Sequence, residues 1–86
     1  MRDVAGKKFL LITKPNCKHC YQAKKLLQKV GATWEERLIG DHVTREEVLA
    51  AYPQMRTVPI VVVDGELLGG ESNLREWLDR EGDDPA

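Results

Sequence analysis

The only two cysteines of this 86-residue chain, Cys17 and Cys20, form a C-x-x-C motif between a strand-like run and a helix-like run. Residues 9–12 are all apolar, whereas residues 20–30 repeat apolar side chains at three- and four-residue steps. Such a junction predicts Cys17 at the first helical turn, where unpaired backbone N–H groups and the helix dipole favour a thiolate. Cys20, one turn further on, can reach back to close a disulfide. The pattern therefore indicates a redox site.

Two other interpretations of the cysteines are open. Free cysteine packs as a small hydrophobe, so both could be ordinary buried residues. Alternatively, Cys17, His19, Cys20 and the distant His42 could supply four zinc ligands. Structural zinc sites usually take a second pair of ligands from a tight knuckle of its own. This chain has no such second pair, so we expect no metal site.

Length and cysteine content restrict the class of protein. A chain of 86 residues predicts a single domain, 1–86, with a core over residues 8–80 and an acidic tail at 81–86. One C-x-x-C is not the framework of a secreted miniprotein and indicates redox use in a reducing compartment. The sequence shows neither a signal peptide nor an apolar stretch long enough to span a membrane. We therefore expect a cytoplasmic monomer that does not bind membranes.

The net charge of −1 hides an uneven distribution. Residues 1–30 contain eight Lys or Arg and one acid, whereas residues 31–86 contain five Arg and thirteen acids. Lys14 and Lys18 flank the cysteines and are expected to favour a thiolate and attract an anionic substrate. Nucleic-acid binding is not expected, because the basic patch is short and interleaves only one aromatic, Tyr21. The other helix lysines are interpreted as a solvated face: Lys24, Lys25 and Lys29.

Lys18 and His19, the pair between the cysteines, are predicted to tune the nucleophile. Lys18 is a permanent cation, and His19 is a cation or a hydrogen-bond donor, so both are expected to lower the pKa of Cys17. The alternative is that both side chains point into water and the helix dipole acts unaided.

The rest of the chain predicts the element order β-α-β-α-β-β-α. Strands are predicted at residues 8–13, 33–39, 60–63 and 66–68. Thr44 opens a capping box with Glu47, and the helix that follows is expected to bury three side chains: Val48, Leu49 and Tyr52. Asp64-Gly65 is a hairpin signal.

Ser72 is placed to cap a last helix whose inner face is formed by Leu74, Trp77 and Leu78. The first two strands should be parallel through a right-handed crossover, and the last two should form an antiparallel hairpin. Trp34, like Trp77, is expected in the core. The predicted fold is therefore α/β, a four-stranded mixed sheet with helices on both faces.

Three blocks of sequence, in this order, resemble the glutaredoxin family. Thr13-Lys14-Pro15-Asn16-Cys17 with Cys20 resembles its active-site run. Arg56-Thr57-Val58-Pro59 resembles its segment with a cis-proline, and Asp64-Gly65 followed by Gly69-Gly70 resembles its hairpin and glycine pair. The similarity covers residues 8–80. It implies the thioredoxin-like fold and a dithiol glutaredoxin.

The resemblance further implies glutathione-dependent thiol–disulfide exchange. Cys17 would be the nucleophile, Cys20 the resolving thiol and glutathione the reductant. The substrates implied are disulfide-containing proteins and glutathione mixed disulfides. Two other functions remain open: an electron donor reduced by thioredoxin reductase, and a module that binds an iron–sulfur cluster between two protomers through Cys17 and glutathione.

The resemblance also assigns residues to glutathione. Lys14 would meet a carboxylate, and the backbone of Val58 would pair with the tripeptide as an added strand does. The Val58–Pro59 bond would be cis. The sequence departs from the family where Lys18-His19 replaces the common Pro-Tyr pair, and where no carboxylate stands after the glycine pair at the usual places. The implied glutathione-binding set is Lys14, Arg56, Thr57, Val58, Pro59, Gly70, Ser72 and Asn73.

Overall fold

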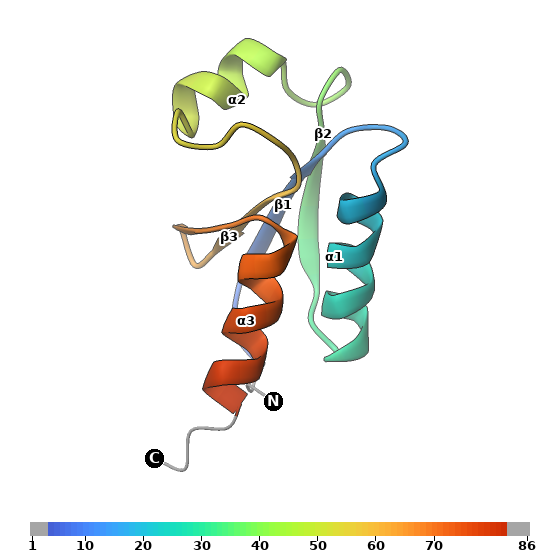
Figure 1. Ribbon diagram of the computed structural model, residues 1–86, viewed down its shortest axis with the longest axis vertical. Coiled ribbons are helices and arrows are strands. Elements are labelled where there is room, and N and C mark those ends of the chain that lie inside the picture. The colour runs from blue at the N-terminus through green and yellow to red at the C-terminus, as the bar shows by residue number, and fades with distance from the viewer. Residues whose placement is uncertain (1–3, 83–86) are drawn as a thin grey trace.

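The elements follow one another in the predicted order β-α-β-α-β-β-α (Figure 1). The structure, a computed structural model, describes residues 4–82, with side chains as far as Asp79. Within these residues the elements are β1 (Phe9–Thr13), α1 (Lys18–Lys29), β2 (Trp34–Leu38), α2 (Arg45–Ala51), β3 (Ile60–Val63), β4 (Glu66–Gly69) and α3 (Glu71–Gly82). The predicted tail, 81–86, lies mostly outside the described residues, but residues 81 and 82 still belong to α3.

The sheet is mixed and has the strand order β2-β1-β3-β4. β1 and β3 lie at its centre and pair antiparallel, with Ile12 opposite Ile60. β2 joins β1 in parallel, and β4 joins β3 as the second strand of a hairpin. These strand directions and the thioredoxin-like α/β fold are confirmed.

Alternating side chains of the two central strands form two cores. Leu11, Val61 and their neighbours on one face pack against α1 and α3, which lie side by side in Figure 1. The buried helix residues on this face are Ala23, Leu27, Leu74 and Leu78. Ile12 and Ile60 face the opposite side, where α2 contributes Val48. Both faces of the central strands are therefore covered, as their unbroken apolar runs predict.

The prediction that Trp34 and Trp77 lie in the core is confirmed, whereas the prediction that Leu49 of α2 is buried is wrong. Trp34 and Trp77 both pack against the first core, and the Trp77 ring meets Phe9 edge-on with 5.9 Å between centroids. The sequence predicts a buried Leu49, but its exposed fraction is 45%. The helix α2 is only seven residues long, and Val48 is its one buried side chain. Leu49 therefore remains at the surface.

Lys24 is not part of a solvated helix face, contrary to the sequence interpretation. Its ammonium donates to Glu36 Oε2 at 2.9 Å, and the buried Thr13 hydroxyl donates to the same oxygen at 2.6 Å. The Thr13 hydroxyl and the Lys24 ammonium hold the pKa of Glu36 below its ordinary value. This contact ties β1, β2 and α1 together where β1 leads into the cysteine loop.

The start of α3 also differs from the prediction, because Ser72 is not its cap. The helix begins at Glu71, and Asn73 Oδ1 accepts the Gly70 N–H at 3.0 Å. Gly69 has φ +133°, and a Cβ placed on it would lie 2.5 Å from that Asn73 oxygen. The first turn of α3 therefore closes over a position where only glycine fits.

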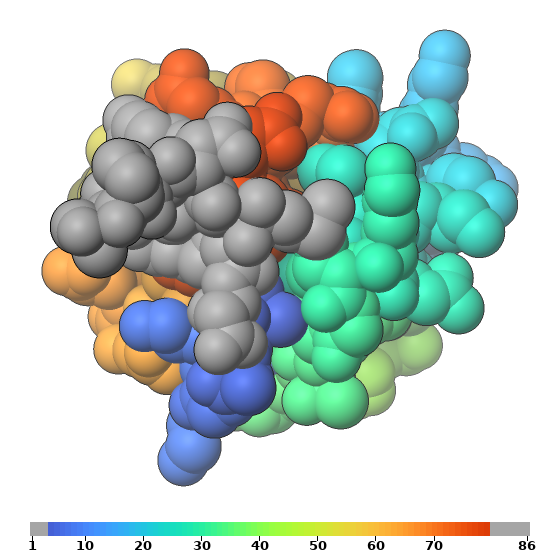
Figure 2. Space-filling model, turned by 90° about the horizontal axis from the view of Figure 1, so that it is seen from below, coloured from blue at the N-terminus to red at the C-terminus, as the bar shows by residue number. Residues whose placement is uncertain are grey.

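The two ends of the sheet have different surroundings. In Figure 1, α2, the cysteine loop and the segment before β3 gather at the end far from the termini. Figure 2 shows the opposite end, with the start of β1 in blue, the end of α1 in green and the β3–β4 turn in orange. Val4, upstream of the predicted core boundary, is buried here. No helix among the described residues is both long and apolar enough to cross a membrane.

We expect Gly69→Ala to lower the free energy of unfolding by about 1–3 kcal/mol, because it adds backbone strain and a clash with Asn73. Gly40→Ala is the matched control, since Gly40 also has a positive φ, +102°, but a methyl group added to it would have no neighbouring atom within 4 Å. Denaturant unfolding of both variants measures the difference. Equal losses would show that the Asn73 contact adds nothing.

Candidate functional site: a cationic cleft beside the Cys17–Cys20 disulfide

Cys17 is the N-cap residue of α1 and forms a disulfide with Cys20. The two Cα atoms are 5.2 Å apart, and the Cys20 backbone N–H donates to Cys17 Sγ at 3.1 Å. Cys17 is half-buried, whereas Cys20 is only 2% exposed. The helix thus supplies one accessible sulfur, already aligned with a backbone donor, and one shielded sulfur behind it.

The turn before Cys17 aims it out of the sheet. Asn16 has φ +57°, a left-handed conformation that asparagine tolerates better than most residues. Cys17 then has extended backbone angles and its carbonyl accepts the Tyr21 N–H at 3.1 Å, the first bond of the helix. The strand end therefore turns sharply into the helix and leaves Cys17 at the corner.

The segment before β3 lies against this corner. The Val58–Pro59 bond is cis, as the resemblance implied. Cys17 Sγ lies 3.9 Å from the carbonyl oxygen of Val58. Because β3 begins at Ile60, the Val58 backbone lies outside the sheet ladder.

A cleft of about 620 Å³ opens beside Cys17. Its cationic lining residues are Lys14, Lys18, Arg45 and Arg56. Its apolar lining residues are Ile39, Val48, Leu49, Met55, Val58 and Ile60. Asn16, His19 and Thr57 complete the wall, and no lining residue carries a carboxylate. The cleft size is that of a small-molecule site, and its charge favours an anion.

The structure brings half of the predicted glutathione set to this cleft. Lys14 lines it from the cysteine loop, and Arg56, Thr57 and Val58 line it from the segment before β3. The other four predicted residues are not among its lining: Pro59, Gly70, Ser72 and Asn73. Gly70 does lie near, since a Cβ built on it would be 3.7 Å from the Pro59 carbonyl oxygen.

Sequence reasoning missed Arg45 and Glu71. Arg45 follows Thr44, the N-cap residue of α2. The capping-box pattern therefore indicates only that Arg45 lies in the first helical turn, and nothing in the sequence indicates that it lines the cleft. Glu71 starts α3 with its side chain 13% exposed, and it accepts from Arg75 Nη2 at 2.6 Å. Its other carboxylate oxygen lies 3.2 Å from Nδ1 of His19. His19 is therefore held toward α3, although its side chain remains 70% exposed.

Glu71 is an anion held by the side chains of Arg75 and His19. The Arg75 guanidinium, together with His19, holds the pKa of Glu71 below its ordinary value, although burial opposes this shift. The carboxylate thus ties the first turn of α1, which carries the C-x-x-C motif, to the first turn of α3.

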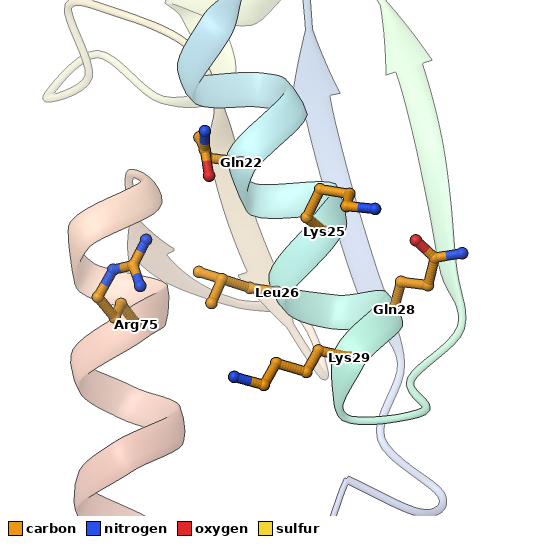
Figure 3. Close-up of a pocket in the computed structure, with 6 residues that line it drawn as sticks. All are labelled: Gln22, Lys25, Leu26, Gln28, Lys29 and Arg75. Carbon is orange, nitrogen blue, oxygen red and sulfur yellow. The ribbon is translucent and has the colours of Figure 1, made fainter.

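A second hollow, of about 440 Å³, lies between α1 and α3 and shares no lining residue with the cleft. Figure 3 shows Leu26 and Lys29 pointing from α1 toward α3, and Arg75 on the facing helix. Among the described residues, no group of three or more His, Cys, Asp or Glu side chains could hold a metal ion.

Comparison with known proteins identifies the family. The chain matches the Glutaredoxin family over residues 9–68, which is more than half of its length. It belongs to the glutaredoxin family. Glutaredoxin 3 of Escherichia coli is 31% identical to it over 75 residues, a match that covers 87% of this chain and 90% of the relative.

Two further proteins are similar to this chain. The hybrid peroxiredoxin hyPrx5 of Haemophilus influenzae is 36% identical over 68 residues, which span 79% of this chain but only 28% of hyPrx5. The structure of a buckwheat glutaredoxin–glutathione complex has a TM-score of 0.71 and 24% identity, and the match covers 92% of this chain and 76% of that one. The latter shows the shared fold. The family and the Cys17–Cys20 pair together make this glutaredoxin a thiol–disulfide oxidoreductase.

We expect acid to destabilise the wild type more than Glu71→Gln. Because the folded state lowers the pKa of Glu71, the carboxylate stabilises the fold above its unfolded pKa, and that contribution is lost as the pH falls through the folded pKa. Denaturant unfolding at a series of pH values, from about 6 downward, follows this loss. The control is Glu66→Gln, the same change at an exposed residue of β4, which should lose as much stability as the wild type. A loss in Glu71→Gln equal to that of the wild type would contradict this role.

Proposed function

We propose that this glutaredoxin uses glutathione to reduce protein disulfides and glutathione mixed disulfides. The observation that carries the proposal is the accessible Cys17 sulfur at the edge of a cleft with four cations and no carboxylate. Glutathione is a tripeptide with two carboxylates, so this lining complements its charge. Its size also suits a cleft of this volume.

Cys17 acts as the nucleophile in this proposal. In the reduced protein its thiolate accepts the Cys20 backbone N–H, a charge-assisted hydrogen bond that stabilises the anion. The thiolate attacks one sulfur of the substrate disulfide and forms a mixed disulfide, while the other substrate sulfur leaves as a thiolate and takes a proton from water.

The mixed disulfide is resolved in one of two ways. With a protein substrate, the Cys20 thiolate attacks Cys17 Sγ, releases the second substrate thiol and leaves the Cys17–Cys20 disulfide seen in the structure. Two glutathione molecules then restore both thiols and leave as oxidised glutathione. With glutathione already on Cys17, a second glutathione releases it directly, and Cys20 is not needed.

Glutathione is held, in this proposal, by the residues that the cleft presents next to Cys17. Lys14 and Arg56 bind its carboxylates, and the backbone of Val58 pairs with its peptide groups as an added strand. Because Val58 lies outside the ladder of β3, its N–H and C=O are not used by the sheet. Thr57 and Pro59, with Gly70, Ser72 and Asn73 at the start of α3, complete the proposed set.

The proposed setting is the cytoplasm, where the glutathione pool keeps thiols reduced and supplies the electrons. The protein acts there as a monomer on disulfide-containing proteins.

Turnover of a glutathione mixed disulfide, coupled to glutathione reductase, tests this function. We expect the wild type to be active, Cys17→Ser to lose all activity and Cys20→Ser to keep some. Cys20→Ser should in contrast fail to reduce protein disulfides, because that reaction needs the resolving thiol.

The alternative function is that of an electron donor reduced by thioredoxin reductase. It is tested in the same assay, with thioredoxin reductase in place of glutathione and glutathione reductase. Activity with thioredoxin reductase alone would refute the use of glutathione. Equal losses from Cys17→Ser and Cys20→Ser in the mixed-disulfide assay would refute the separate roles of the two cysteines.

We expect Lys18→Gln to raise the titration midpoint of Cys17 by about half a pKa unit, because it removes a cation that lines the same cleft. His19→Gln should shift it less, since Glu71 already holds the His19 ring. Alkylation of Cys17 in the reduced protein across a pH series measures each midpoint. Lys29→Gln, at the far end of α1, is the control for lost charge. If the Cys17 midpoint in Lys18→Gln equals that of the wild type, Lys18 does not lower the pKa of Cys17, and any lowering comes from the helix backbone.

A further inference from the structure

The α2 side of the cleft has features that glutathione does not explain. We define this side as Arg45, Val48 and Leu49 of α2 with Met55 of the following loop, all of which line the cleft. Leu49 is 45% exposed, and it and Tyr21 are the exposed large hydrophobic residues among those that the structure describes. Glutathione is γ-glutamyl-cysteinyl-glycine and has no aliphatic side chain to cover this surface.

The charge of the cleft also exceeds what glutathione needs. Four cations line it, and the tripeptide brings two carboxylates. Within the part of the chain that the structure describes, no carboxylate forms an ion pair with Arg45 or Arg56. Glu47, on the same helix turn as Arg45, is used by the capping box, where it accepts the Thr44 N–H at 2.7 Å. Arg45 is therefore free to meet an acidic group on a partner.

We propose that this α2 side binds the polypeptide that carries the target disulfide, and that it selects segments with an aliphatic and an acidic residue next to the reacting cysteine. The inference rests on the proposed disulfide exchange at Cys17. The aliphatic side chain covers Leu49 and Met55, and the carboxylate pairs with Arg45. Val48 lies below Leu49 and Met55 and packs against the buried sheet residues Ile12 and Ile60, which fixes the position of this surface.

The geometry favours a peptide segment as the occupant. The cleft reaches from Cys17 to α2, so a polypeptide whose cysteine is joined to Cys17 has an open path over this surface. The apolar contact supplies affinity through burial of aliphatic groups, and the ion pair supplies selectivity between acidic and basic partners. Both contacts lie outside the glutathione-binding set proposed above.

Three synthetic peptides, each closed by one intramolecular disulfide, provide the test. They differ only in the two residues after the first cysteine: Leu-Glu, Leu-Lys and Ser-Glu. Reduction is followed with glutathione and glutathione reductase, and each kcat/KM is divided by the rate constant for reduction of the same peptide by dithiothreitol. This removes differences in the intrinsic reactivity of the peptides.

We expect the wild type to prefer Leu-Glu over Leu-Lys by about three- to tenfold, the range for one or two partly exposed ion pairs. Arg45→Glu should reverse this preference, whereas Lys29→Glu, the same charge change at the far end of α1, should preserve it. Leu49→Ser should remove the preference for Leu-Glu over Ser-Glu, and Ala50→Ser, at the neighbouring exposed position, should preserve it. Each ratio is internal to one variant, so a partly folded sample does not alter it.

Equal rates for the three peptides in the wild type, or unchanged ratios in Arg45→Glu and Leu49→Ser, would overturn this inference. In either case turnover of the glutathione mixed disulfide by the same wild-type sample would leave the proposed function standing. Turnover of neither the mixed disulfide nor any peptide would overturn both.

Discussion

The antiparallel pairing of β1 with β3 is the constraint on which the site depends. Ile12 pairs with Ile60, so the end of β1 and the start of β3 lie at the same end of the sheet. A short turn then carries the chain from β1 to Cys17, and Val58 precedes β3 by two residues. The pairing therefore places the reactive sulfur beside the Val58 carbonyl, although the two are far apart in sequence. Burial of both faces of these strands makes this register costly to change.

A second contact holds the helix that carries the motif. Glu71, at the first residue of α3, binds Arg75 of its own helix and meets His19 of α1. The Glu71 side chain is largely shielded from solvent, so the carboxylate is held firmly and its interactions are weakly screened. This contact holds the His19 ring toward α3. The cleft wall on the α2 side is independent of this contact.

The sequence by itself determined the elements, their order and the reactive pair. Strand and helix periods are local properties, and each apolar run here is bounded by a turn or capping signal, so the strands and helices could be predicted within a few residues. A C-x-x-C at a strand-to-helix junction places Cys17 at the helix start for the same local reason. The family resemblance added the cis bond before Pro59, which the structure contains.

Only the tertiary structure decided which polar and apolar side chains meet. Lys24 binds Glu36 because the crossover from α1 to β2 brings them together, which no helix period reveals. Leu49 stays exposed because α2 is short and reaches the sheet through Val48 alone. Arg45 lines the cleft because α2 packs beside the cysteine loop. At the start of α3, Asn73 rather than Ser72 accepts a backbone N–H, that of Gly70. Local patterns specify a residue's own element, whereas its partners depend on how distant elements pack.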